Sequence, residues 1–210
     1  MSNWDSLMVE HEKRRWDILE KALDVFIREG FENATFQKIA DLCGITRTIL
    51  YTYFNNKKEI FNYSIKQFME TIEADVHSVR QDATLNSVDK LTAVFALILA
   101  RLEENRRLLL VIRDYLLLRD DANKLVKRRT IRMRHIFSSM IIEGIRAGEL
   151  MPLNVREVGD LLYGFLELAI FRLTVLKRSE VGELKQSSAL CIRQLSTTLY
   201  HVVDSVVTKL

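Results

Sequence analysis

The chain has 210 residues, of which 48% are hydrophobic, and a formal net charge of +3. This length suggests one or two domains with enough apolar residues to bury a core. One proline and seven glycines provide too few turn signals for a sheet protein with many short strands, so we expect an all-helical fold.

The amino-terminal segment, MSNWDSLMVEHEKRRW, lacks the apolar run of a signal peptide. No window approaches the roughly 20 apolar residues of a membrane span. Cys43 and Cys191 match no metal or redox spacing, which is typical of small buried thiols in a reducing compartment. We therefore expect a cytoplasmic protein without contact to a membrane.

The first predicted helix covers residues 13–29 and ends at Gly30. Its apolar positions recur with a helical period at Ile18, Leu19, Ala22, Leu23 and Phe26.

The next segment, ATFQKIADLCGITRTILYTYFNNKKEIF at residues 34–61, predicts two short helices at 36–42 and 47–54. Thr35 and Thr46 can cap them, because a threonine hydroxyl accepts an unpaired backbone N–H. Gly44 can adopt the left-handed conformation that ends a helix sharply. Ala40 is small enough for the two helices to approach closely. This layout is that of a helix-turn-helix, whose second helix enters the major groove of DNA.

The charge distribution supports this interpretation better than the net charge does. Residues 1–60 hold nine Lys or Arg against ten Asp or Glu, yet residues 42–58 contain no acid and include Arg47, Lys57 and Lys58. The domain as a whole is therefore nearly neutral, but the segment at residues 42–58 forms a basic edge.

Six further helices are predicted at 56–79, 85–103, 106–119, 121–147, 156–176 and 183–207, which brings the total to about nine. The helix at 106–119 is apolar nearly all round, which indicates a buried helix. We place the DNA-binding domain at residues 1–56 and a helical effector-binding and dimerisation domain at 57–210, with the helix at 56–79 linking the two.

The first sixty residues resemble the DNA-binding domain of the TetR family of bacterial repressors, most strongly over residues 13–61. The resemblance rests on a helix ending in Gly-aromatic, a capped Ile-Ala helix, a Gly-Ile-Thr turn, Leu-Tyr-x-Tyr-Phe and Lys-x-Glu-Ile-Phe. Thr48 departs from the pattern, since many members have a small residue there. The residues involved are Ile18, Leu19, Ala22, Leu23, Phe26, Gly30, Phe31, Thr35, Ile39, Ala40, Gly44, Ile45, Thr46, Leu50, Tyr51, Tyr53, Phe54, Lys57, Glu59, Ile60 and Phe61.

Arg47 is the first candidate for reading a base, because arginine can donate two hydrogen bonds to guanine. A phosphate contact by the same side chain is the alternative. Thr48 and Thr52 lie one turn apart and offer a hydroxyl and a methyl group to base edges, or are merely exposed.

The resemblance implies phosphate contacts by Tyr51 and Tyr53, although Tyr53 could instead be a packing residue. Lys57 is expected to meet a phosphate near the amino terminus of the following helix, and Lys58 is a further candidate. Thr35 either contacts a phosphate or only caps its helix, and Thr46 belongs to the same surface.

A helix-turn-helix reads only a few base pairs, so specificity requires two copies about 34–36 Å apart or a multiple of that spacing. The last two helices carry more apolar surface than one core needs, and the resemblance implies a four-helix dimer interface. Alternatively, both stripes face an intramolecular core. The interface candidates are Leu162, Phe165, Ala169, Leu195, Leu199, Val202 and Val206.

The resemblance also implies a cavity in the helical body that binds a small molecule and thereby releases DNA. For each candidate lining residue, a place in the core is the more common role than contact with a ligand. The candidates are Phe68, Phe95, Tyr115, Phe137, Met140, Tyr163, Phe165 and Glu167.

The run KLVKRRTIRMRH, from Lys124 to His135, holds six Lys or Arg, and there is no acid from 122 to 142. A solvated helix face, or pairing with acids on neighbouring helices, explains it more simply than DNA or an anionic ligand does.

Four histidines share no ligand spacing, and no nucleophile motif or glycine-rich phosphate loop occurs. We therefore expect neither catalysis nor a metal or cofactor. The sequence indicates a homodimeric transcription regulator, most simply a repressor. The alternatives are an activator, and a ligand- or partner-binding module whose DNA-binding domain is vestigial.

Overall fold

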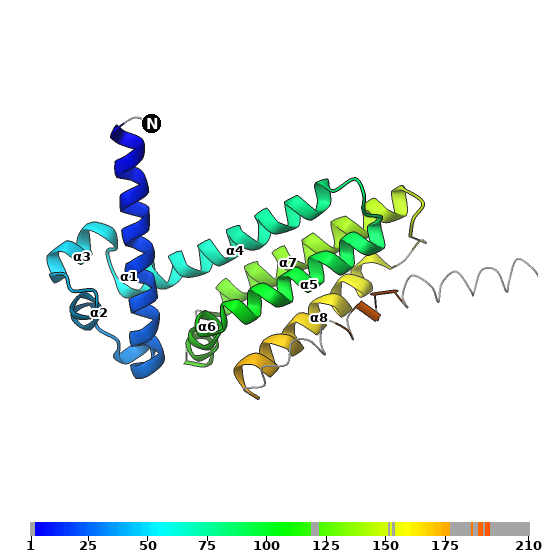
Figure 1. Ribbon diagram of the computed structural model, residues 1–210. Helices are drawn as coiled ribbons and strands as arrows, with labels where there is room; N and C mark the ends of the chain where they lie inside the picture. Colours follow the sequence, from blue (N-terminus) through cyan, green and yellow to red (C-terminus); the bar gives the residue numbers. More distant parts are fainter. Residues whose placement is uncertain are drawn as a thin grey trace, which may run out of the picture. The chain divides into compact units, whose positions relative to one another are not determined.

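The computed structural model describes residues 3–118, 122–150, 152, 154–176, 186, 189, 190, 192 and 193. Side chains are described for all of these except residues 3–8 and 116–130. All the secondary structure in this part of the chain is helical, which confirms the predicted fold class (Figure 1). The helices are α1 (Asn3–Asn33), α2 (Phe36–Leu42), α3 (Arg47–Tyr53), α4 (Lys57–Gln81), α5 (Ser87–Glu104), α6 (Arg106–Leu118), α7 (Ala122–Arg146) and α8 (Val155–Thr174). The ninth predicted helix, at 183–207, lies outside the residues described as continuous structure.

The chain divides into two compact units. The first comprises residues 1–70 and 107–119, and the second comprises residues 71–106 and 120–210. Helix α4 contributes to both units, and α6 belongs with the amino-terminal helices although it follows α5 in the chain. The boundary expected after residue 56 remains a prediction.

In the first unit, α1 begins ten residues earlier than predicted. Its regular geometry breaks at Gly30, where φ is +77°, and a further turn leads to Asn33. The early start has a tertiary cause, because the His11 ring stacks on Tyr53 at 4.9 Å and the Glu12 carboxylate accepts a hydrogen bond from the Tyr63 hydroxyl at 2.6 Å.

The core of the first unit joins all of its helices. The rings of Phe31 and Phe61 lie 4.8 and 4.5 Å from that of Tyr115 on α6, so the predicted burial of this helix is correct on the face that carries Tyr115. Side chains at most 2% exposed in this core are those of Ile18, Ala22, Val25, Phe26, Ala34, Ile39, Ala40, Leu50, Phe54, Ile60, Phe61, Ile65 and Val111.

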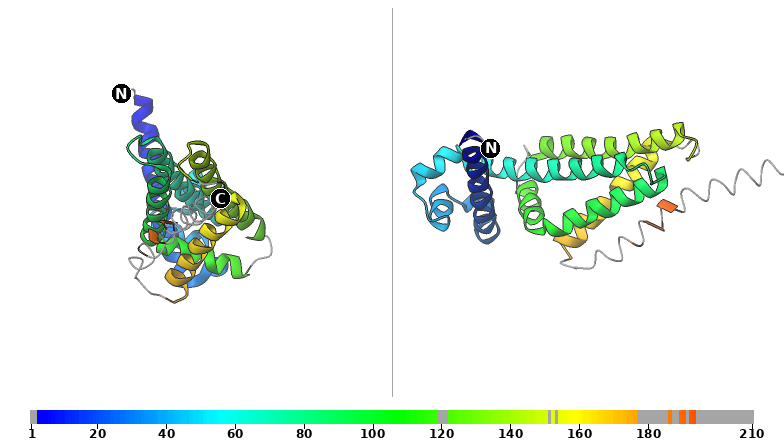
Figure 2. Two further views of the ribbon diagram at one scale, coloured as in Figure 1. Left: turned by 90° about the vertical axis from the view of Figure 1, so that its right-hand side faces the viewer. Right: turned by 45° about the horizontal axis from the view of Figure 1, so that its top comes forward.

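In the second unit, α5, α7 and α8 pack side by side (Figure 2). Gly159 of α8 lies against α7, since a Cβ atom there would meet the Ser138 hydroxyl oxygen at 3.0 Å. Phe95 of α5 packs against Phe137 of α7 and Phe165 of α8, with ring centroids 6.0 and 6.3 Å apart. These contacts give the unit a core between the three helices.

Ion pairs join α4 to its neighbours within this unit. Asp75 pairs with Arg101 of α5 at 2.6 Å, and Glu73 accepts a hydrogen bond from Arg132 of α7 at 2.6 Å. Arg80 pairs with Glu143 of α7. The carboxy-terminal half of α4 is thus fixed to both α5 and α7.

Candidate DNA-binding surface

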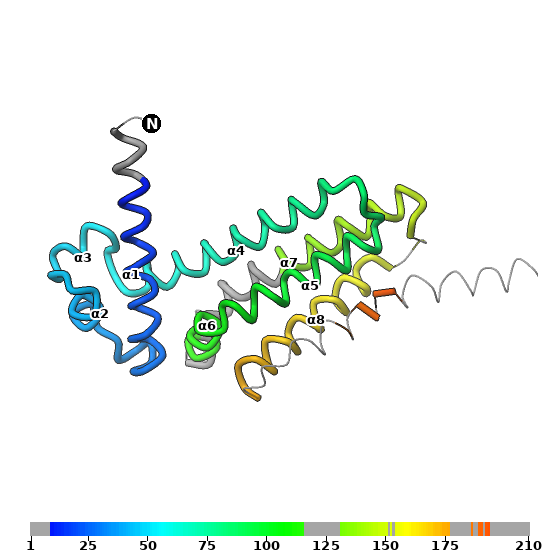
Figure 3. The backbone as a smooth tube through the Cα atoms, in the orientation of Figure 1, coloured from blue at the N-terminus to red at the C-terminus, as the bar shows by residue number. Residues whose placement is uncertain are grey.

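The α2–α3 turn is built as the sequence predicts. The Thr35 hydroxyl accepts the Lys38 N–H at 3.3 Å and the Thr46 hydroxyl accepts the Ile49 N–H at 3.2 Å, so both helices are capped. Gly44 has a φ of +65°, and the next N–H, that of Ile45, reaches the Ala40 carbonyl at 3.1 Å. Figure 3 follows the backbone through this turn, which sets α3 against α2.

One side of α3 is exposed and the other is buried. Leu50 is fully buried, and Phe54 at the carboxy-terminal cap is 1% exposed, so both belong to the core. The exposed face of α3 consists of Arg47, Thr48, Ile49, Tyr51 and Thr52.

Arg47 is held in place by its own helix. Its guanidinium donates to the Tyr51 hydroxyl at 3.0 Å and lies 5.5 Å from the centre of that ring. The Tyr51 ring in turn lies 4.9 Å from Phe36 of α2. A long flexible side chain is therefore oriented before any ligand arrives, which reduces the entropy lost on binding.

Thr48 and Thr52 lie on the exposed face as predicted. The Thr52 hydroxyl donates to the Ile49 carbonyl at 2.7 Å, so its oxygen remains an acceptor while its hydrogen is already used. Ile49, which the sequence reasoning did not single out, is 44% exposed beside it.

Tyr53 is half-buried and stacks on His11, with an interplanar angle of 26°. This contact favours the packing alternative for its ring. Thr35 and Lys58 are both exposed, and Thr35 acts as the cap of α2.

Lys57 has a different arrangement from the one expected. Its ammonium group donates to the carbonyl oxygens of Phe31 and Glu32 at 2.7 Å each and of Ala34 at 3.1 Å. An ammonium group has three donors, and these carbonyls use them all. The geometry argues against the expected phosphate contact and gives Lys57 the role of closing the end of α1.

A second arginine supports the base of α3, and the sequence reasoning did not identify it. The Arg15 guanidinium lies 4.0 Å from the centre of the Tyr63 ring and 4.8 Å from that of Phe54. Glu12 pairs with Arg15 at 3.4 Å, three residues earlier on the same helix. This i, i+3 spacing of opposite charges was the available signal.

The predicted ligand residues separate into the two units. Phe68 and Tyr115 are buried in the first unit, and the other six lie in the second. There, Phe95, Phe137 and Met140 are buried, and Phe165 and Tyr163 are half-buried, with Arg134 lying over the Tyr163 ring at 5.3 Å. Glu167 is exposed, so its expected place in an enclosed cavity gains no support from the structure.

A groove that the sequence did not indicate lies between α4 and α7 in the second unit. Its volume is about 410 Å³, and it is lined by Glu73, Val76, His77, Arg80, Gln81 and Ile136.

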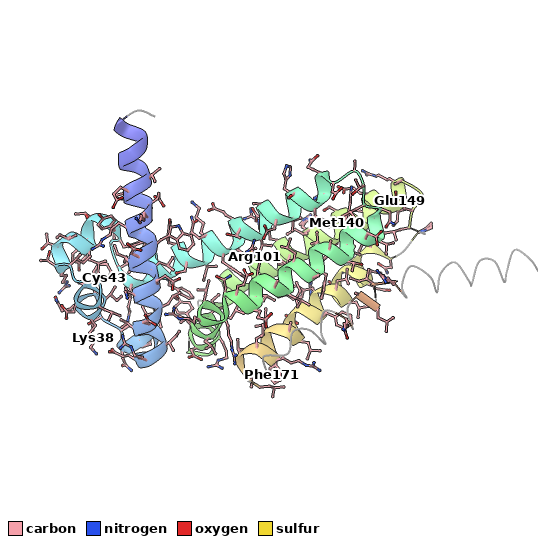
Figure 4. The ribbon with its side chains drawn as sticks, viewed as in Figure 1. Lys38, Cys43, Arg101, Met140, Glu149 and Phe171 are labelled. Carbon is pink, nitrogen blue, oxygen red and sulfur yellow. The ribbon has the colours of Figure 1, made fainter. Side chains whose placement is uncertain are left out.

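The two faces of α8 differ in their surroundings. Leu162 and Ala169 are fully buried within this chain, and Phe165 packs on Phe95, so these three interface candidates face the core of the second unit. The other candidates, Leu195, Leu199, Val202 and Val206, lie outside the described residues. An outer stripe of α8 is 42–49% exposed and consists of Leu161, Leu168, Phe171 and Val175, of which Phe171 is labelled in Figure 4.

The described part of the basic run is paired with acids. Arg132 binds Glu73 of α4, and Arg134 pairs with Asp160 of α8 at 3.1 Å. These contacts agree with pairing to neighbouring helices, while the side chains of Lys124, Lys127, Arg128 and Arg129 lie outside the described part.

Neither a metal site nor a membrane span is found in the described residues. No three His, Cys, Asp or Glu side chains there gather closely enough to hold a metal ion. None of the described helices is both long enough and apolar enough to cross a bilayer.

Comparison with known proteins places the amino-terminal helices in a family. Residues 18–63 match the family model described as bacterial regulatory proteins, tetR family. The chain is 26% identical over 170 residues to the fatty acid metabolism regulator protein of Bacillus subtilis, covering 76% of this chain and 83% of that protein. It is 25% identical over 162 residues to the repressor KstR2 of Mycobacterium tuberculosis, covering 73% and 76% of the two chains.

The fold is shared with solved structures. The transcriptional regulator FadR from Bacillus subtilis in complex with stearoyl-CoA superposes with a TM-score of 0.70 at 20% identity, covering 86% of this chain and 97% of that one. A TetR-family regulator from Syntrophomonas wolfei superposes with a TM-score of 0.76 at 19% identity, covering 89% and 96% of the two chains.

Proposed function

Because this chain belongs to the TetR family of bacterial regulatory proteins, we propose that it is a sequence-specific transcriptional repressor. It binds a palindromic operator as a homodimer and is released by a small-molecule effector. The observation that carries the proposal is the exposed face of α3, on which Tyr51 holds Arg47 above a correctly capped helix-turn-helix.

Arg47 reads a guanine in this proposal. Its two terminal nitrogens can donate to O6 and N7 in the major groove, a contact that discriminates by about 1–3 kcal/mol. Tyr51 holds the guanidinium against its own helix, and it contacts a phosphate when the complex forms. The acid-free segment at residues 42–58 leaves no carboxylate on α3 to repel the DNA backbone.

The first test is fluorescence anisotropy on a duplex from the gene's own upstream region against a scrambled duplex, over a series of salt concentrations. We expect the native duplex to bind at least about 10³-fold more tightly, with strong salt dependence. Arg47→Ala is expected to lower the ratio of the two affinities at least about tenfold.

Arg28→Ala is the matched control, because Arg28 is an exposed arginine of α1 in the same unit. It removes the same charge and is expected to leave the ratio unchanged. If Arg47→Ala also left it unchanged, α3 would not be the reading helix. Absence of binding to either duplex at low salt would favour the partner-binding module.

The homodimer uses the outer stripe of α8 in this proposal. Four large apolar side chains, at positions 161, 168 and 171 of α8 and at its carboxy-terminal cap, 175, are spaced seven, three and four residues apart and so share one side of the helix. Their exposure to water is unfavourable, so this surface favours a partner. A second copy is the partner that a palindromic operator requires, because twofold symmetry in the protein matches twofold symmetry in the site.

The effector in this proposal is a long-chain acyl thioester of coenzyme A. Two findings support this class: the relative named as a fatty acid metabolism regulator, and the similar fold that was solved with stearoyl-CoA.

Titration of the protein–operator complex with stearoyl-CoA tests this choice, with free coenzyme A and stearate as controls. Release by the thioester alone is the expected result. Because an effector acts only through unequal affinity for the two states, failure of all three to release DNA would exclude this class.

A further inference from the structure

Ile49 lies in the middle of α3 with 44% of its surface exposed. An isolated exposed isoleucine on a protein surface is ordinary, but this one lies on the same exposed face of α3 as Arg47, Thr48 and Thr52. Its position on the helix that enters the groove raises the question of what it contacts there.

The exposed face has two chemically different flanks. Successive residues of an α-helix are separated by about 100°. Arg47 and Tyr51 therefore lie on one flank, where they are hydrogen-bonded to each other, and Ile49 lies beyond Thr52 on the other. The first flank supplies hydrogen-bond donors, whereas the second supplies apolar groups.

The hydrogen bond of Thr52 completes this division. Because its hydroxyl donates to the Ile49 carbonyl at 2.7 Å, the Thr52 oxygen can only accept a hydrogen bond from a base. An apolar side chain beside a hydrogen-bond acceptor complements a T·A pair, which presents the thymine C5-methyl group and the adenine N6 amino group in the major groove.

We propose that Ile49 is a specificity-determining residue that recognises the C5-methyl group of a thymine in each operator half-site. This inference rests on the proposed DNA-binding function and adds the identity of one base to it. Arg47 then selects a guanine and Ile49 a thymine, so the two flanks of a seven-residue helix read different bases.

The test is a uracil scan of the operator. Each thymine of both half-sites is replaced in turn by uracil, which differs only in lacking the C5-methyl group, and anisotropy measures the affinity. We expect one symmetric pair of replacements to weaken binding about fourfold per half-site, as expected for one methyl-sized group no longer buried.

In Ile49→Ala, binding to the natural operator is expected to weaken and the effect of uracil at that pair to disappear. 5-Methylcytosine carries the same methyl group, so the wild type is expected to bind an operator with 5-methylcytosine at that position more tightly than one with cytosine. Ile49→Ala is expected to bind the two operators equally. Ile27→Ala serves as the matched control, because Ile27 is 40% exposed on α1 in the same unit, and it should keep the wild-type uracil profile.

Thr52 also carries a methyl group, which Thr52→Ser removes while keeping the hydroxyl. If Ile49 makes the contact, Thr52→Ser should keep the wild-type uracil profile. A uracil effect that survives Ile49→Ala but is lost in Thr52→Ser would overturn the proposal. A specific operator complex without any uracil effect would overturn it while leaving the proposed function intact. Absence of specific binding to any duplex would overturn both.

Discussion

Individual side chains in the amino-terminal half of α1 hold the carboxy-terminal end of α3 in place. Arg15 lies over the rings of Tyr63 and Phe54, and Glu12 accepts the Tyr63 hydroxyl. This hydrogen bond, followed by the charge of Arg15, outweighs burial and lowers the pKa of Glu12, whereas burial and Glu12 raise the pKa of Tyr63 to about 12. Through these contacts the Glu12 carboxylate is connected to Tyr63 and Arg15, which pack against Phe54 at the end of α3.

The direction of these shifts predicts how stability depends on pH. Because the pKa of Glu12 is lower in the folded protein than its ordinary value of 4.5, its contribution is present above that pH and is lost as the pH falls through the folded pKa. Glu12→Gln should therefore lower the melting temperature at pH 7, through the loss of about 1 kcal/mol of hydrogen bonding. Wild type and variant should converge toward pH 3.

Thermal unfolding between pH 7 and pH 3 checks this prediction. Glu10→Gln removes an equal charge from an exposed position of the same helix and should follow the wild-type curve throughout. A gap between Glu12→Gln and wild type that stayed constant down to pH 3 would contradict the assignment.

At the scale of elements, the joint between α1 and α4 depends on one side chain. Lys57 in the first turn of α4 binds three carbonyl oxygens at the end of α1 and the start of the loop to α2. Its ammonium also lies 5.0 Å from the Phe31 ring. The first turn of α4 is thereby attached to the segment from which the helix-turn-helix begins.

Lys57→Met should destabilise the protein by about 1–3 kcal/mol, because three carbonyl oxygens, two of them in part-buried hydrogen bonds, lose a charged donor. Operator affinity should fall with the misplacement of α2 and α3, while its dependence on salt stays unchanged. If Lys57 neutralised a phosphate, its replacement would instead lower the slope of log affinity against log salt concentration by about one.

Denaturant unfolding and anisotropy over a series of salt concentrations measure both quantities. Lys58→Met is the matched substitution at the next residue, where the side chain is exposed. A reduced salt slope together with wild-type stability for Lys57→Met would restore the phosphate contact that the sequence suggested.

At the scale of the whole molecule, the chain crosses between its two units after residues 70, 106 and 119. Helix α6 packs in the amino-terminal unit through Tyr115, and Arg107 pairs with Glu20 of α1 at 3.0 Å. Both of its chain neighbours, α5 and α7, belong to the other unit. The connectivity therefore provides two covalent routes, besides α4, between the second unit, where we propose that the effector binds, and the amino-terminal helices.

The outer stripe of α8 yields a prediction about assembly. Phe171→Glu places a charge among exposed apolar side chains, so it should convert the proposed dimer to a monomer and weaken operator binding. Sedimentation equilibrium measures the mass of the particle. Ile142→Glu is the control, since Ile142 is 37% exposed on α7. Phe171→Glu that remained dimeric would place the interface elsewhere.

Local patterns in the sequence accounted for the helices and the turn between α2 and α3. Thr35, Gly44 and Thr46 act on their own backbone neighbours, so their roles follow from sequence spacing. The observed bounds of α2 and α3 agree with the predicted ones within a residue for the same reason.

Side-chain partners that lie far apart in the sequence could not be obtained in this way. Lys57 has the spacing and charge of a phosphate ligand, and only the fold brings the carbonyls 23–26 residues earlier to its ammonium. Likewise, the helical period of α8 shows two apolar stripes, and packing against α5 and α7 decides that the one with Leu162 and Ala169 faces inward.

The sequence by itself determined that this protein is helical, where its helix-turn-helix lies and that Arg47, Thr48, Tyr51 and Thr52 lie on the exposed side of α3, because caps, turns and helical periods are local properties of the chain. Only the tertiary structure decided that Lys57 supports the fold, that α6 belongs with the amino-terminal helices and that Arg47 is held by Tyr51 above Phe36. These depend on the free energy of packing between segments distant in sequence, which no local pattern records.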